Sequence, residues 1–163
     1  MNIIIQGACM REFKNSKEAI TYAKDGWKDF FDSLSESQRN LLLSLQSSGR
    51  YRNEYSDKPI IEAYEEAFKI TPCVEEDIVV YRGGYRKDFS YKRPFLATSL
   101  LKESVAKFAE SKGAHLYRII IMKGAPIIPT CGMGVMGCEP EEEVAIETKR
   151  LKWKWFTRTY YYK

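Results

Sequence analysis

The stretch IVVYRGG, residues Ile78–Gly84, marks a change in the hydrophobic pattern of this sequence. A run of apolar and aromatic residues followed by an arginine and a pair of glycines is typical of a short buried strand that ends in a turn. We therefore predict a strand over Ile78–Tyr81, cut off by Arg82, Gly83 and Gly84. Before this stretch the sequence has a helical period, and after it the pattern is mostly that of strands.

Three amphipathic helices are predicted in residues 1–70. The first covers Glu18–Leu34. The second begins at Ser35, where Ser35 and Gln38 have the spacing of a capping box, and ends at Ser47-Ser48-Gly49. The third begins near Pro59. Each carries apolar residues at helical intervals that suit packing against a core: Ala19, Ile20, Ala23, Trp27, Phe30, Phe31 and Leu34, then Leu41, Leu42, Leu43 and Leu45, then Ile60, Ile61, Tyr64, Ala67 and Phe68.

The rest of the chain is predicted to form a sheet with one helix. The expected elements are strands at Phe95–Leu100, Leu116–Met122, Glu141–Thr148 and Leu151–Tyr162, a helix at Lys102–Ser111, an extended segment at Pro126–Pro129 and a glycine-bearing loop at Gly132–Pro140. The last two strands are expected to form a hairpin that turns near Lys149 and Arg150. This order predicts one α+β domain, with a helical part at 1–70 and a mainly antiparallel, β-rich part at 71–163.

Composition and charge exclude several classes of protein. A chain of 163 residues suits one domain, and its 44% hydrophobic and 13% aromatic content is unlike that of a disordered chain. The net charge of +4 is too small to identify a nucleic-acid binder. No apolar run approaches the ~20 residues that span a bilayer, and the start lacks the pattern of a signal peptide. We expect a monomeric cytoplasmic protein that does not bind membranes.

The metal-binding residue types are sparse. One histidine, His115, and four cysteines that form no CxxC pair do not make a usual zinc site. We therefore expect no metal, and thiols that stay reduced.

A pair of glutamates near the C-terminus is a candidate for chemistry. Alternate residues of a strand share a face, so the carboxylates of Glu141 and Glu143 are expected to point into one space, with Glu142 on the opposite face. Such a pair suits a reaction through a cationic sugar, in which one carboxylate stabilises the positive charge and the other handles a proton. A solvated acidic strand end would have the same pattern.

Arg82 and the neighbouring hydroxyls of Thr98 and Ser99 are further candidates. An arginine at a strand end can bind a phosphate, and a following glycine lets a ligand approach the backbone. The hydroxyls can orient a ligand or join strands. Taken alone, these features are as typical of turns and sheet packing as of a binding site.

The order of these motifs resembles the ADP-ribosyltransferase family, and more narrowly its Arg-Ser-Glu branch, which includes clostridial exoenzymes and phage-encoded enzymes. The shared features are aromatic-Arg-Gly at Tyr81–Gly83, Thr98-Ser99, and Glu-x-Glu-Val at Glu141–Val144, within about half of the chain. The resemblance implies a β core split around an NAD cleft. It also implies transfer of ADP-ribose from NAD, which is the substrate, to a macromolecule with release of nicotinamide.

The resemblance implies a role for each matching residue on the cofactor side. Arg82 would hold the NAD phosphates, and Gly83 would offer backbone groups to the nicotinamide amide. Thr98 and Ser99 would shape the cleft. Phe108 lies where the family often places an aromatic ring against nicotinamide, although its helical stripe equally suits the core.

On the catalytic side, Glu143 matches the catalytic glutamate and Glu141 matches the upstream glutamate that positions the acceptor. A glutamate at the upstream position favours arginine as the acceptor. We expect a host protein as acceptor, in a bacterial cell, with nucleic acid as the other acceptor class. One departure is clear: Ala97 stands where the family has the serine that braces the catalytic glutamate.

Other functions also suit the sequence. Hydrolysis of NAD, with water as the acceptor, is the second enzymatic interpretation, and Ala97 favours it. A non-enzymatic alternative is a basic module that binds nucleic acid or a host protein through the cations and aromatic rings of Lys152–Tyr160. A closing strand with one apolar and one charged face explains this segment more simply.

Overall fold

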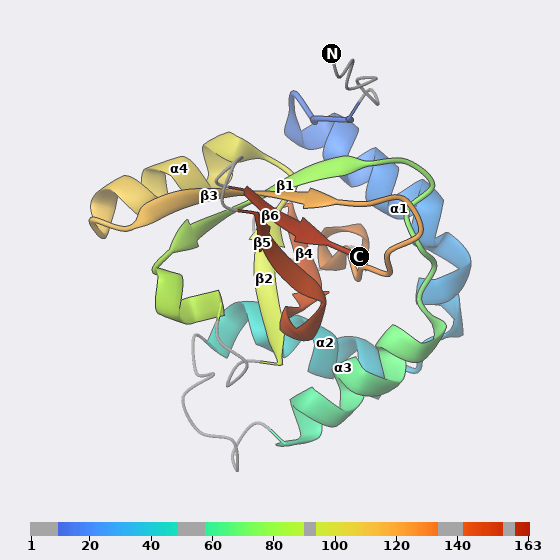
Figure 1. Ribbon diagram of the computed structural model, residues 1–163. Coiled ribbons are helices and arrows are strands. Elements are labelled where there is room, and N and C mark those ends of the chain that lie inside the picture. The colour runs from blue at the N-terminus through green and yellow to red at the C-terminus, as the bar shows by residue number, and fades with distance from the viewer. Residues whose placement is uncertain (1–9, 49–57, 90–93, 134–141, 155–158) are drawn as a thin grey trace.

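Figure 1 shows a computed structural model of the chain, in which helices surround a strongly curled sheet. The structure describes residues 10–48, 58–89, 94–133, 142–154 and 159–163. It is a single domain of the predicted α+β class. Its helices are α1 (Ser16–Ser33), α2 (Glu36–Ser48), α3 (Lys58–Ile70) and α4 (Lys102–Ser111), with short 3-10 turns η1 (Arg86–Phe89), η2 (Thr130–Met133) and η3 (Thr148–Arg150).

Helix α1 confirms the first predicted helix and supplies much of the core. It begins after Asn15, whose side chain accepts a hydrogen bond of 2.9 Å from the backbone N–H of Glu18 and so satisfies one of the unpaired donors of the first turn. Trp27 reaches across the core, where its Nε1 donates to Thr71 Oγ1 at 3.0 Å and to the Ile127 carbonyl at 3.1 Å. The buried stripe consists of Ala19, Ala23, Trp27, Phe30 and Phe31.

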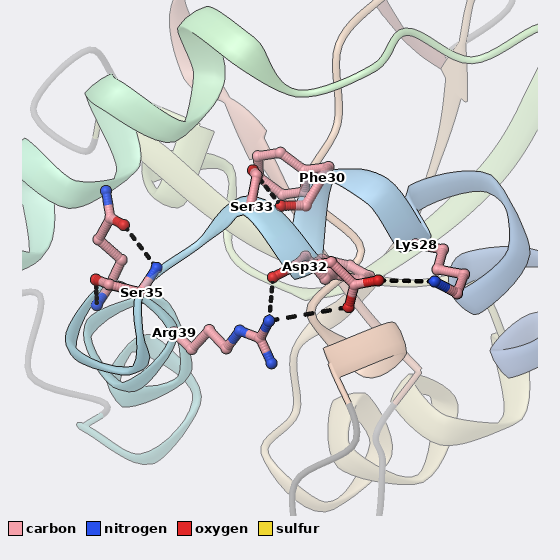
Figure 2. A network of polar contacts seen from close by, with 8 residues as sticks. Lys28, Phe30, Asp32, Ser33, Ser35 and Arg39 are labelled. Carbon is pink, nitrogen blue, oxygen red and sulfur yellow. Dashed lines mark hydrogen bonds and ion pairs between the residues drawn. The ribbon is translucent and has the colours of Figure 1, made fainter.

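A capping box opens α2, as the sequence predicts. The Ser35 hydroxyl accepts from the backbone N–H of Gln38 at 3.2 Å, and the Gln38 side chain accepts from the backbone N–H of Ser35 at 2.9 Å. Figure 2 shows this junction, where Arg39 of α2 reaches back to the last turn of α1 and contacts the carbonyl of Phe31 and the carboxylate of Asp32. The capping box and the contacts of Arg39 therefore connect the two helices across a short turn.

Helix α3 packs its predicted stripe against α2 and the sheet. Tyr64 is fully buried and donates its hydroxyl to the Leu42 carbonyl of α2 at 2.6 Å. The ring of Phe68 stacks on Phe95 of the sheet, with centroids 5.5 Å apart. Within the described ranges, no helix is both long and apolar enough to cross a membrane.

The sheet has six strands in the order β4-β2-β1-β3-β6-β5. All neighbouring pairs are antiparallel except β3 with β6, so the predicted, mainly antiparallel arrangement is confirmed. The strands are β1 (Ile78–Gly84), β2 (Phe95–Ser99), β3 (His115–Ile121), β4 (Glu143–Glu147), β5 (Leu151–Lys154) and β6 (Thr159–Tyr162).

The turn predicted at Arg82-Gly83-Gly84 is wrong. Strand β1 continues through all three residues and pairs with β3 as far as Gly84, which lies opposite His115. Gly83 and Gly84 are buried. Glycine weakens a strand but does not end it when a neighbouring strand supplies the hydrogen bonds, and here β3 runs alongside for the full length of β1.

The predicted hairpin between the last two strands is also wrong. Strands β4 and β5 lie at opposite edges of the sheet, and β5 forms its hairpin with β6 instead. Every residue of β4 is buried, which suits a strand covered on both faces, whereas β5 alternates between half-buried and exposed residues. Because only the short turn η3 joins the two edge strands, the sheet must curl enough to bring the end of β4 near the start of β5. Figure 1 shows the curled sheet.

Candidate active site

The site forms at the first residue of β4, where the predicted catalytic Glu143 lies. Glu143 is 5% exposed and pairs with Ser99 of β2, which in turn pairs with Tyr81 of β1. Residues opposite each other in antiparallel strands carry their side chains on the same face. Tyr81, Ser99 and Glu143 therefore form one row across the sheet, with Ser99 next to Glu143.

An extended segment covers the other side of β4. The predicted extended run Pro126–Pro129 is confirmed, since Ile128 and Ala145 exchange backbone hydrogen bonds of 3.1 and 2.9 Å. Two residues further along, Thr130 lies beside Glu143, with its Oγ1 3.2 Å from the Glu143 carboxylate and 3.2 Å from the Glu143 carbonyl. Sequence reasoning missed this contact, because a single threonine before a glycine loop carries no motif.

Arg82 lies next to the site but on the other face of the sheet. Strand alternation points its side chain away from the row that contains Tyr81, Ser99 and Glu143. Its Nη1 donates to the Ala97 carbonyl of β2 at 2.5 Å, so the guanidinium holds β1 and β2 together. Gly83 is buried and paired with Leu116.

The neighbouring hydroxyls of Thr98 and Ser99 are used differently. Thr98 alternates to the opposite face from Glu143, and its Oγ1 donates to the Val144 carbonyl at 2.8 Å. Ser99 shares the face of Glu143, and its Oγ accepts from the backbone N–H of Leu101 at 3.1 Å. The two residues thus belong to different environments although they are adjacent in sequence.

Of the remaining predicted residues, Phe108 lies in α4 and Glu141 lies outside the described residues. Strand β4 begins at Glu143, and Glu142 just before it has a φ of 45°. The prediction that Glu141 and Glu143 point the same way assumed a strand that includes both residues, but the described strand begins only at Glu143. The shared face of the two carboxylates stays a prediction.

Glu142 is a buried carboxylate that sequence reasoning had left without a role. It is 4% exposed and accepts hydrogen bonds from Ser16 at the start of α1 and from Ser104 of α4, the latter at 2.6 Å. Its backbone carbonyl accepts from the N–H of Leu100 at 2.9 Å. The Glu142 side chain therefore connects both helices to the start of β4. Its backbone has a left-handed conformation that glutamate seldom adopts.

The thiol of Cys131 lies close to both glutamates. Burial raises its pKa to about 12, and the negative charges of Glu142 and Glu143 add to the effect. The thiol therefore stays protonated at neutral pH, which makes it a poor nucleophile. Among the described residues, no cluster of three or more His, Cys, Asp or Glu side chains could hold a metal ion.

The row of polar side chains continues beyond Tyr81. Its hydroxyl donates to Glu12 at 2.9 Å, and Arg118, opposite Tyr81 on β3, contacts the same carboxylate at 3.2 Å. Burial, together with the bond to Glu12, raises the pKa of Tyr81. Close by, an open pocket of about 630 Å³ follows the first turns of α1, lined by Arg11, Asn15, Lys17, Glu18, Thr21, Tyr22 and Asp25.

Comparison with solved structures identifies proteins of the same architecture. The Plx2a toxin of Paenibacillus larvae, an ADP-ribosyltransferase, superposes with a TM-score of 0.61 at 18% identity, over 84% of this chain and 85% of its own. An ADP-ribosyltransferase of Clostridium botulinum gives a TM-score of 0.62 at 12% identity, over 94% and 96% of the chains. The C3 exoenzyme of Clostridium limosum gives 0.60 at 12% identity over 94% and 95%.

No family model and no curated protein matches the chain by sequence. The structural similarity extends over nearly the whole of both chains, so it concerns the complete domain and not an isolated motif. This chain has the fold of the ADP-ribosyltransferase toxins.

Proposed function

We propose that this protein is a mono-ADP-ribosyltransferase that moves ADP-ribose from NAD to a macromolecular acceptor. The observation that carries the proposal is the position of Glu143, a buried carboxylate at the first residue of β4 in the fold of the ADP-ribosyltransferase toxins. The motif order around Tyr81-Arg82, Thr98-Ser99 and Glu143 adds support from the sequence.

The reaction uses this carboxylate as a fixed negative charge. The glycosidic bond between nicotinamide and ribose breaks, the electron pair leaves with nicotinamide, and positive charge develops on the ribose ring. The Glu143 carboxylate stabilises that charge and accepts a hydrogen bond from a ribose hydroxyl. The acceptor then bonds to the anomeric carbon and loses its proton.

Arg82 and Gly83 are proposed to bind NAD, as the motif implies. The motif order alone supports this role for Arg82, because its side chain lies on the opposite face of the sheet from Glu143 and bonds to the Ala97 carbonyl. Ser99, on the face of Glu143, and Phe108 are proposed to line the nicotinamide side. Thr98, on the opposite face, is proposed to shape the cleft through its bond to the Val144 carbonyl. Glu141 is proposed to orient the acceptor, for which arginine of a host protein is favoured.

The test is incubation of the pure protein with labelled NAD and a bacterial lysate, beside Glu143→Gln. Glu147→Gln is the matched control, because Glu147 is a second buried glutamate of β4, placed on the same face and paired with Lys149 and Arg150. We expect label on a discrete band with wild type and Glu147→Gln, and a loss of about a thousandfold with Glu143→Gln. Equal labelling by Glu143→Gln would contradict the proposal.

NAD hydrolysis is the second candidate, favoured by Ala97 at the position of the bracing serine. The same experiment without lysate separates the two activities. Release of nicotinamide at one rate with and without acceptor indicates a hydrolase, whereas acceleration by lysate and labelled product indicate a transferase. NAD that stays intact under all conditions would favour the non-enzymatic alternative, a basic module that binds nucleic acid or a host protein.

A further inference from the structure

We propose that Thr130 is the positioning residue for Glu143, supplying the hydroxyl that Ala97 cannot. The inference rests on the proposed function, in which Glu143 is the catalytic carboxylate. It concerns a residue of the segment beside β4, outside every motif noted in the sequence.

Thr130 is a direct neighbour of Glu143. An isolated antiparallel bridge joins Ile128 to Ala145, and two residues further on Thr130, the first residue of η2, reaches Glu143 with its side chain. On the other side of β4, Ser99 lies opposite the same glutamate. The hydroxyl-bearing residues Thr130 and Ser99 thus lie on either side of Glu143.

Two distances show what the Thr130 hydroxyl does. Its Oγ1 lies 3.2 Å from the Glu143 carboxylate and 3.2 Å from the Glu143 carbonyl, so its one proton is shared between two acceptors of the same residue. A hydroxyl that bonds to the backbone carbonyl and to the carboxylate of the same residue limits rotation about the side-chain bonds between them. The hydroxyl therefore restricts the direction in which the carboxylate points.

Each of the two hydroxyls on β2 has a hydrogen bond to a backbone group. Thr98 points to the opposite face and donates to the Val144 carbonyl, and the Ser99 oxygen accepts from the Leu101 backbone. Ala97 shares the face of Glu143 but has no polar atom in its side chain. The hydroxyl that holds Glu143 is therefore supplied by Thr130 on one side of β4, and not by the residue at the motif position, Ala97, on the other side.

Thr130 is held rigidly enough to position the Glu143 carboxylate. It is 1% exposed, and its backbone N–H donates to the Ile128 carbonyl at 3.0 Å. The adjoining Ile128 is tied to β4 by both of its backbone groups. A positioning group needs such rigidity, since a displacement of about 1 Å can cost roughly a hundredfold in rate.

The experiment compares Thr130→Val, which removes the hydroxyl at constant shape, with Thr130→Ser, which keeps it. The measured quantities are kcat and KM for nicotinamide release from NAD, and the melting temperature. We expect Thr130→Val to lower kcat about ten- to a hundredfold with KM within about threefold, and Thr130→Ser to stay within about threefold of wild type.

Thr71→Val is the matched control for loss of a buried hydroxyl. Thr71 is 8% exposed, and its Oγ1 donates to the Ile127 carbonyl at 2.7 Å, away from Glu143. It should lower the melting temperature as Thr130→Val does while keeping kcat. Should Thr130→Val not fold, Thr130→Ala replaces it, with the same expectation for kcat.

Each outcome decides between the two proposals. An active wild type with kcat unchanged in Thr130→Val overturns the role of Thr130 and leaves the proposed function standing, as does an equal loss in Thr130→Val and Thr130→Ser. A wild type that cleaves no NAD overturns both together. A loss in Thr130→Val that Thr130→Ser does not share supports both.

Discussion

The two edges of the sheet differ in how their strands are covered. Strand β4 is buried at every residue, enclosed between β2 and the extended segment Pro126–Pro129, while β5 alternates between half-buried and exposed residues. The β4 edge holds its carboxylates in fixed directions. The β5 edge presents Lys152 and Lys154 to solvent on one face and packs Trp153 on the other. The β4 edge therefore suits chemistry that needs a charge held in a fixed position. The β5 edge suits a surface that faces solvent or a partner.

The largest expected difference between the edges is in turnover. Glu143→Gln should lower nicotinamide release about a thousandfold, because a neutral amide cannot stabilise the ribose cation. The double variant Lys152→Ala, Lys154→Ala should stay within about twofold, because exposed surface changes seldom alter a distant site. Steady-state assays with NAD check both. A comparable loss of nicotinamide release in the lysine variant would mean that the β5 edge takes part in the function, as the binding-module alternative requires.

Stability should show the next largest difference, at Glu142 just before β4. Glu142→Ala removes a charged acceptor from Ser16 and Ser104 and should cost about 2–3 kcal/mol in the free energy of unfolding. Glu142→Gly should be less harmful by about 1 kcal/mol, since glycine adopts the φ of 45° without strain. Denaturant unfolding measures both values. Equal losses would mean that the backbone conformation contributes nothing.

A third prediction asks whether the two sides of β4 are interchangeable. Ala97 pairs with Ala145, two residues along β4 from Glu143 and on the same face, so a serine hydroxyl there comes within reach of the long Glu143 side chain. Ala97→Ser should change kcat of wild type little but recover about tenfold in a Thr130→Val background. A double-mutant cycle on kcat checks this. Additive effects of the two substitutions would show that the two hydroxyls act independently.

The smallest expected effect is the pH dependence at Cys131. Its folded pKa of about 12 lies above the unfolded value of 9.0, so the unfolded thiol loses its proton first and stability falls as pH rises above about 9. Between pH 9 and 10 this group should cost up to about 1.4 kcal/mol. Cys131→Ala should reduce the slope of unfolding free energy against pH by that amount. Identical slopes would mean that the thiol is solvated.

Local sequence patterns predicted the helices closely. The capping box at Ser35 and Gln38 forms as expected, and α4 covers Lys102–Ser111 as predicted. Helix ends and apolar stripes depend on residues within a few positions of each other, which is why a single sequence reveals them. The change of period at Ile78 likewise identified the start of the sheet.

Strand partners were not predictable in the same way. Arg82-Gly83-Gly84 indicated a turn, but β3 pairs with all three residues and keeps them in the strand. The adjacent strands β4 and β5 suggested a hairpin, but burial on both faces favours β4 beside β2. In both cases the deciding contacts come from residues distant in sequence, which no local pattern contains.

The sequence by itself determined the α+β class, the helices and the glutamate on which the proposed chemistry depends. Only the tertiary structure decided the surroundings of that glutamate: Thr130 beside Glu143, and Glu142 bonded to Ser104 and to Ser16, which lies 126 residues away in the chain. The physical reason is that a side chain's type is written in the sequence, whereas its direction and its partners follow from strand register and from the curl of the sheet.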